Sequence, residues 1–232
     1  MTSGETLSRA RGGGPAADVT GVVVVVHGGQ SVSTEATSAF QLAVLRMVPV
    51  VYAIRHTLQG TGAVVCRPRL LVRGWNGEQA SPVPDLSRTL DRIGAKFGQV
   101  PIVLVGHSMG ARAAFRVAGH PAVSAVAGLA PWLPPGEPVA QLAGRRVLLV
   151  HGNADGITRP DETWAYAERA CAVTGAAVIE IRGGDHPMLR RASLWHDIAA
   201  EFTRSALQLP AHETDVAAAV SRTSANPSRT VL

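Results

Sequence analysis

The chain has 232 residues, of which 46% are hydrophobic and 17% are charged. This length allows one α/β domain that buries a large core without disulfides or metals, and the composition excludes a wholly disordered chain. The net charge of +5 comes from 21 arginines and one lysine, scattered along the sequence. Because no basic helix, aromatic stacking motif or RNA-binding signature accompanies this charge, we expect no nucleic-acid partner.

The two cysteines give no sign of a metal site or a disulfide framework. Cys66 and Cys171 lie far apart and form no ligand spacing with other cysteines or histidines. The first 21 residues lack the apolar core of a secretory signal, and no apolar run is long and uncharged enough to span a membrane. We therefore expect a cytoplasmic protein without a metal ion or an organic cofactor.

Short apolar runs rich in β-branched residues recur along the middle of the chain and predict strands. In chain order the predicted strands are 21–29, 63–72, 100–106, 122–130, 145–152 and 176–184, and helical segments are predicted near 35–58, 84–97, 109–119, 161–174 and 187–206. Continuous apolar runs are typical of strands that are covered on both faces. The alternation predicts an α/β fold with a doubly wound, mostly parallel sheet of about six strands flanked by helices.

The domain limits follow from the same pattern. Residues 1–18 are rich in glycine and small polar residues, and residues 208–232 have no hydrophobic periodicity, so we expect a disordered N-terminal tail and a flexible C-terminal tail. One domain then covers residues 19–207. Pro160 and Pro187 stand where the last two helices are predicted to begin, in a first turn that tolerates a missing N–H group.

One turn in this pattern has the features of a nucleophile site. The segment VPIVLVGHSMGARAAFRVAG, residues 100–119, joins a buried strand to a helix with almost no connecting loop. Ser108 therefore has to adopt a cramped backbone conformation, and the glycines at 106 and 110 relieve the crowding. Such a turn exposes the serine hydroxyl above the end of the sheet, where a base can reach it.

A serine hydroxyl needs a base, and the base needs an orienting group. Ligands bind beyond the carboxyl ends of the strands in open parallel sheets, so both groups are expected in loops that follow strands. His186 in GGDHPM and Asp155 in HGNADGITRP meet this condition. Asp161 and Asp185 are the competing acids, but Asp161 reads as a first-turn helix residue and Asp185 as a turn or capping residue.

Attack on a carbonyl also requires backbone amides that stabilise the oxyanion. One is expected from Met109, directly after the serine at the start of a helix. The other is expected from the HGGQ loop, where glycine allows close approach of the backbone. Gly29 is the predicted donor, with Gly28 and Gln30 as its neighbours. The alternative is that HGG only terminates its strand.

Three further side chains fall on the same rim of the predicted sheet. Trp75, Asn76 and Trp132 follow strands and are candidates for the wall of a substrate pocket. For the two tryptophans, plain packing is an equal alternative. Trp164 and Trp195 lie on predicted helices and are expected in the core.

The Gly-x-Ser-x-Gly pattern between a strand and a helix, followed by an aspartate and a histidine at later strand ends, resembles the α/β-hydrolase family. The resemblance covers about residues 20–205. It implies Ser108 as nucleophile, His186 as general base and then acid, Asp155 as its orienting carboxylate, and Gly29 and Met109 as oxyanion-hole donors.

Departures from the family pattern narrow the type of hydrolase that we expect. Only PWLPPGEPVAQLAG separates the fourth predicted strand from the fifth, which implies a minimal cap and an open site. Small esterases, thioesterases and dienelactone-hydrolase-like members have this character, although dienelactone hydrolases proper use cysteine where this chain has serine.

These observations predict a serine hydrolase, monomeric or weakly associating. Its expected substrate is a small molecule with an acyl ester or thioester, cleaved through an acyl-enzyme intermediate. The alternatives are an acyltransferase on the same scaffold, or a non-catalytic binding protein that retains the fold.

Overall fold

The computed structural model describes residues 6–9, 19–221 and 229–232. These residues form one sheet in the order β1-β3-β2-β4-β5-β6-β7-β8. Strands β2 to β8 run parallel, and β1 pairs with β3 in the antiparallel sense. The strands are β1 Thr6–Arg9, β2 Val22–Val26, β3 Val64–Arg67, β4 Ile102–His107, β5 Val123–Leu129, β6 Arg146–Gly152, β7 Ala176–Ile181 and β8 Arg229–Val231.

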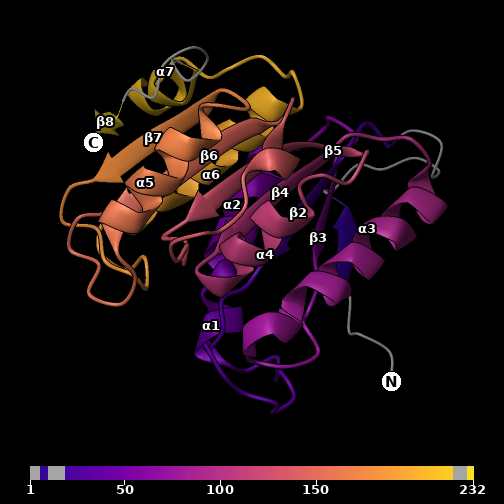
Figure 1. The fold of residues 1–232 in the computed structure, drawn as a ribbon. Coiled ribbons are helices and arrows are strands. Elements are labelled where there is room, and N and C mark those ends of the chain that lie inside the picture. Colours follow the sequence, from indigo (N-terminus) through magenta and orange to yellow (C-terminus); the bar gives the residue numbers. More distant parts are fainter. Residues whose placement is uncertain (1–5, 10–18, 222–228) are drawn as a thin grey trace.

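Helices cover both faces of the sheet (Figure 1). Side chains of α3, α4 and α5 pack on one face, and those of α2, α6 and α7 pack on the other. The α-helices are α1 Leu42–Leu45, α2 Met47–Thr57, α3 Pro82–Phe97, α4 Met109–Val117, α5 Pro160–Ala170, α6 Ala192–Ala206 and α7 Asp215–Ser221. This arrangement confirms the predicted α/β class. In the described part of the chain, no helix combines the length and the hydropathy that crossing a bilayer requires.

Strand β2 shows why its sequence is apolar without alternation. All five valines of β2 are fully buried. Val22, Val24 and Val26 point into the cluster under α3 and α4, whereas Val23 and Val25 point into the cluster under α2 and α6. Each buried valine contributes about 1.5 to 3 kcal/mol relative to exposure. A polar residue in β2 would therefore face an apolar layer on either side.

The described residues of the C-terminal segment, 208–221 and 229–232, differ from the flexible tail that the sequence predicts for 208–232. Helix α7 packs against α6, and β8 pairs in parallel with β7 at the edge of the sheet. The alanine-rich helix and the three-residue strand are too short to give a periodic signal. At the other end, Thr6–Arg9 forms β1, while the rest of the predicted tail, residues 1–5 and 10–18, lies outside the described residues.

The two prolines behave differently. Pro160 is the first residue of α5, as predicted. Pro187 does not begin a helix, because α6 begins only at Ala192. The chain between Pro187 and Ala192 forms a turn first. The Asp185 carboxylate accepts hydrogen bonds from two backbone amides of this turn, at 2.9 and 3.0 Å. The prediction for Pro187 is therefore wrong, because a side-chain-capped turn precedes the helix.

Candidate active site

Ser108 occupies a strained turn between β4 and α4. Its backbone lies at φ 53° and ψ −121°, a region that costs a non-glycine residue about 1 to 3 kcal/mol. Neighbouring strands hold this conformation: the Ser108 N–H donates to the Leu129 carbonyl at 3.1 Å, and the Trp132 N–H donates to the Ser108 carbonyl at 3.3 Å. The turn is therefore fixed by β5 and by the loop that follows it.

The two glycines of the turn are required by space. A Cβ atom at Gly110 would lie 2.3 Å from the carbonyl oxygen of His27, and one at Gly106 would lie 2.5 Å from Cα of Ala111. Both distances are far below van der Waals contact, and in both cases the obstacle is backbone that cannot move aside. The crowding that the sequence predicts at positions 106 and 110 is present in the structure.

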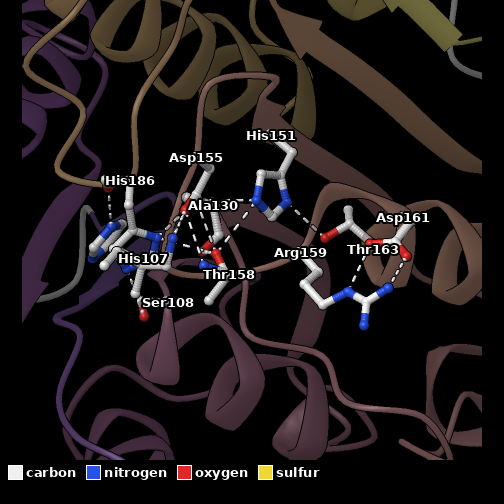
Figure 2. A network of polar contacts seen from close by, with 11 residues as sticks. His107, Ser108, Ala130, His151, Asp155, Thr158, Arg159, Asp161, Thr163 and His186 are labelled. Atoms are coloured by element: carbon white, nitrogen blue, oxygen red, sulfur yellow. Dashed lines mark hydrogen bonds and ion pairs between the residues drawn. The ribbon is translucent and has the colours of Figure 1, made fainter.

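Three side chains predicted from separate loops meet at the carboxyl end of the sheet (Figure 2). The Ser108 hydroxyl lies 3.1 Å from Nε2 of His186, and Nδ1 of His186 lies 2.8 Å from Oδ2 of Asp155. Ser108 and His186 are each only 8% exposed, and the Asp155 side chain is fully buried. These contacts form one line of hydrogen bonds from the hydroxyl through the imidazole to the carboxylate.

The environment of Asp155 keeps its carboxyl group ionised. Its Oδ1 accepts hydrogen bonds from the backbone amides of Ile157 and Thr158, at 2.7 and 2.9 Å. Its Oδ2 accepts from the Thr158 hydroxyl at 2.9 Å and from Nε2 of His151 at 3.1 Å. Burial tends to raise the pKa of Asp155, but the hydrogen bonds from His151, His186 and the two amides together hold this pKa well below its usual value.

Two residues of this network were missed at the sequence level. Thr158 lies 3.1 Å from Nδ1 of His186 as well as bonding Asp155, so its hydroxyl borders both groups. His151 contacts Asp155 from the opposite side, and its Nδ1 accepts from the Thr163 hydroxyl at 2.7 Å. The position of His151 at the end of β6, four residues before Asp155, was a usable signal. Nothing in the sequence distinguishes Thr158 from other loop threonines.

The competing acids lie elsewhere. Asp161 is in the first turn of α5, where its exposed side chain pairs with Arg159 at 2.5 Å. Asp185 caps the turn before α6. Among the three aspartates weighed from the sequence, Asp155 is the one in hydrogen-bond contact with His186.

His107 supports the loop that carries His186. Its buried ring lies 4.9 Å from the His186 ring, and its Nε2–H donates to the His186 carbonyl at 2.9 Å. Its Nδ1 is buried and has no hydrogen-bond partner among the described residues. Burial first, and the neighbouring His186 second, lower the pKa of His107 to about 3. The ring is therefore neutral at physiological pH.

We expect this neutral ring to make folding sensitive to acid. The unfolded chain protonates His107 near pH 6.5 but the folded chain only near pH 3, so protons favour unfolding between these values. From pH 7 to pH 5 this single group should lower the free energy of unfolding by about 2 kcal/mol. Urea unfolding of the parent and of His107→Gln, which retains a donor but does not titrate, measures the difference. Equal pH slopes in the two proteins would contradict the assignment.

The predicted oxyanion donors lie next to each other. A Cβ atom at Gly29 would come within 2.3 Å of the Met109 side chain, so the glycine loop rests against the start of α4. In the described part of the chain, the Gly29 and Met109 amides have no hydrogen-bond acceptor, whereas the Gln30 amide donates to the Arg73 carbonyl at 2.8 Å. The Met109 amide stands at the positive end of the α4 dipole, which favours an anion, and Gly29 lies against the Met109 thioether.

The rim residues separate into two groups. Trp75 and Trp132 line a cavity of about 640 Å³ and also pack against the core. Asn76 instead holds its own loop together: its Oδ1 accepts from the Ser33 amide at 2.9 Å, and its Nδ2 donates to the Ser33 carbonyl and to the Ser81 hydroxyl, both at 3.1 Å. The structure thus places the tryptophans at the cavity and gives Asn76 a supporting position.

The other two tryptophans lie on helices, as predicted. Trp195 on α6 is fully buried, and the half-buried ring of Trp164 on α5 contacts the His151 ring, with centroids 6.0 Å apart. Within the described residues, no three His, Cys, Asp or Glu side chains converge as metal ligands would.

Comparison with known proteins agrees with this fold. A family model described as alpha/beta hydrolase fold matches residues 72–167. Esterase Est1E from Butyrivibrio proteoclasticus, with ferulic acid bound, is 14% identical at a TM-score of 0.66, covering 88% of this chain and 95% of that one. A serine hydrolase without a lid from Xanthomonas campestris is 19% identical at a TM-score of 0.60, covering 90% of each chain.

An esterase from Pyrococcus furiosus is 15% identical at a TM-score of 0.63, covering 81% of each chain. No curated protein matches the sequence significantly. The protein has the α/β-hydrolase fold, and the family resemblance drawn from its sequence is confirmed.

Proposed function

We propose that this protein is a serine hydrolase that cleaves a small acyl ester or thioester through an acyl-enzyme intermediate. The observation that carries the proposal is the line of contacts from the Ser108 hydroxyl through His186 to Asp155, at 3.1 and 2.8 Å. Serine is a weak nucleophile until a base accepts its proton, and this arrangement supplies an oriented base.

In the proposed reaction, the Ser108 oxygen attacks the acyl carbon while its proton moves to Nε2 of His186. The Asp155 carboxylate accepts a hydrogen bond from Nδ1–H of His186 and stabilises the imidazolium cation. The imidazolium then protonates the leaving alcohol or thiol, which departs and leaves an acyl ester on Ser108. In the second half, His186 takes a proton from water while the water oxygen attacks the acyl carbon. The bond from the acyl carbon to the Ser108 oxygen then breaks, the imidazolium returns the proton to that oxygen, and the acid is released.

The tetrahedral intermediate carries a negative charge that needs stabilisation. The Gly29 and Met109 amides are the proposed donors, because both are free of other acceptors among the described residues. Met109 is the first residue of α4, and Gly29 packs against its side chain. Loss of one such donor typically costs about 3 to 4 kcal/mol of transition-state stabilisation.

The short connection after β5 supports a small substrate. Residues 130–145 hold one 3-10 turn, Ala140–Leu142, between β5 and β6. This connection is too short for a helical lid, and one structural neighbour is itself a serine hydrolase without a lid. The neighbour with ferulic acid bound also favours small esters. We further propose a cytoplasmic location, since no disulfide joins Cys66 to Cys171.

A screen of p-nitrophenyl esters and acyl-CoA thioesters of graded acyl length tests the proposal. We expect turnover of short esters or thioesters by the parent protein and by Ser124→Ala, a control serine on β5 away from the site. Ser108→Ala should lose this turnover. Added alcohol or thiol acceptors distinguish hydrolysis from acyl transfer through the products formed. Full activity in Ser108→Ala would overturn the proposal, and a parent protein inactive on every ester and thioester would favour the binding protein.

A further inference from the structure

A charged cavity adjoins the candidate active site and has no part in the triad. It measures about 640 Å³ and is lined by residues that include Trp75, Trp132, Arg112 and Arg116. Two backbone hydrogen bonds connect its wall to the nucleophile: the amides of Arg112 and Trp132 both donate to the Ser108 carbonyl, at 3.2 and 3.3 Å. Arg112, on the wall of the cavity, therefore follows the nucleophile by one helical turn.

The guanidinium of Arg112 is held rigidly at this wall. It packs against two nearly perpendicular indoles, 3.8 Å from the Trp75 ring centroid and 4.5 Å from that of Trp132. Its Nε donates to the buried carboxylate of Glu137 at 2.5 Å, and Nε of Arg116 donates to the same carboxylate at 2.6 Å. Both arginines are thus oriented before any ligand arrives, which reduces the entropic cost of binding.

The pair of arginines has more charge and more donors than Glu137 can use. Two guanidinium groups share one carboxylate, and the bonds to Glu137 involve Nε and Nη2 of each arginine. Nη1 of Arg112 and of Arg116 has no partner among the described residues. The side chain of Arg116 is 35% exposed. Glu78, which also lines the cavity, is exposed, so water weakens its opposing charge.

Resting on the proposed function, we propose that this cavity selects substrates whose acyl or leaving group carries a carboxylate. The free Nη1 donors can bind carboxylate oxygens through charge-assisted hydrogen bonds. Arg112 and Arg116 follow Ser108 by four and eight residues, which corresponds to about 6 and 12 Å along the helix axis. The carboxylate is then separated from the reacting carbonyl by a short linker, as in a half-ester of a short dicarboxylic acid.

A matched pair of esters tests the selection. p-Nitrophenyl hydrogen glutarate carries a carboxylate at the end of its acyl chain, and p-nitrophenyl pentanoate is its neutral counterpart. We expect kcat/KM to favour the glutarate ester by about 10- to 100-fold, the value of one charge-assisted hydrogen bond, and the ratio to fall in high salt. Arg116→Gln should bring the ratio close to one, and Glu78→Gln should raise it. Arg88→Gln, an exposed arginine on α3, is the control that keeps the ratio.

A binding measurement separates this proposal from the proposed function. Trp75 and Trp132 lie at the cavity, so ligand binding should change the tryptophan fluorescence of Ser108→Ala protein. We expect saturable quenching by glutarate, none by pentanoate, and loss of the glutarate response in the Ser108→Ala, Arg116→Gln double variant. Saturable binding without any ester turnover would overturn the hydrolase and leave the cavity assignment standing. Equal kcat/KM for the two esters, or no saturable glutarate response, would overturn the cavity assignment.

Discussion

Replacing Asp155 with asparagine is expected to lower kcat about 10⁴-fold, the loss typical of a misoriented base. The carboxylate accepts hydrogen bonds from His186 and His151 and from two backbone amides. An asparagine amide has one oxygen acceptor and presents an N–H₂ group to the other donors, so Nδ1 of His186 loses the charge that fixes its tautomer. Initial rates on the best ester found in the screen measure the change.

Asp161→Asn is the matched control for Asp155. Asp161 lies six residues further along the chain, but its side chain is exposed and pairs with Arg159. We expect this variant to retain activity close to that of the parent protein. Full activity in Asp155→Asn together with a large loss in Asp161→Asn would show that the acid is assigned to the wrong residue.

Replacing His186 with alanine is expected to lower kcat by roughly 10⁵- to 10⁶-fold, because among the described residues the Ser108 hydroxyl bonds the imidazole of His186 and no other. His56→Ala, which removes a histidine of α2 stacked on Tyr52, is the control. Substantial turnover by His186→Ala would contradict the role of His186.

The sequence located the main side chains of the site because local rules determine their positions. A serine between glycines at a strand-to-helix junction has few backbone options, and parallel strands bring their following loops to one edge. Ser108, Asp155 and His186 could therefore be placed at one rim without knowing any distance between them. The six central strands were predicted for a similar reason, since covered parallel strands have continuous apolar sequences.

Other parts of the site and of the fold depend on tertiary contacts, which leave no recognisable pattern in the local sequence. Thr158 borders Asp155 and His186 only because its loop folds back, and its sequence context resembles an ordinary turn. The pairing of Arg112 and Arg116 with Glu137 joins α4 to the loop after β5, more than twenty residues away. The edge strand β8 is similarly defined by its pairing with β7 rather than by its own three residues.

The central claim is that the Ser108 hydroxyl is activated by its contact with His186, and a fluorophosphonate probe tests it most directly. Such probes phosphonylate serines that a neighbouring base activates and leave ordinary serines unmodified. Intact-mass analysis of the treated parent protein should show one adduct per chain, with peptide mapping placing it on Ser108, and Ser108→Ala and His186→Ala should remain unmodified. An unmodified parent protein, or an adduct that persists in Ser108→Ala, would contradict the claim.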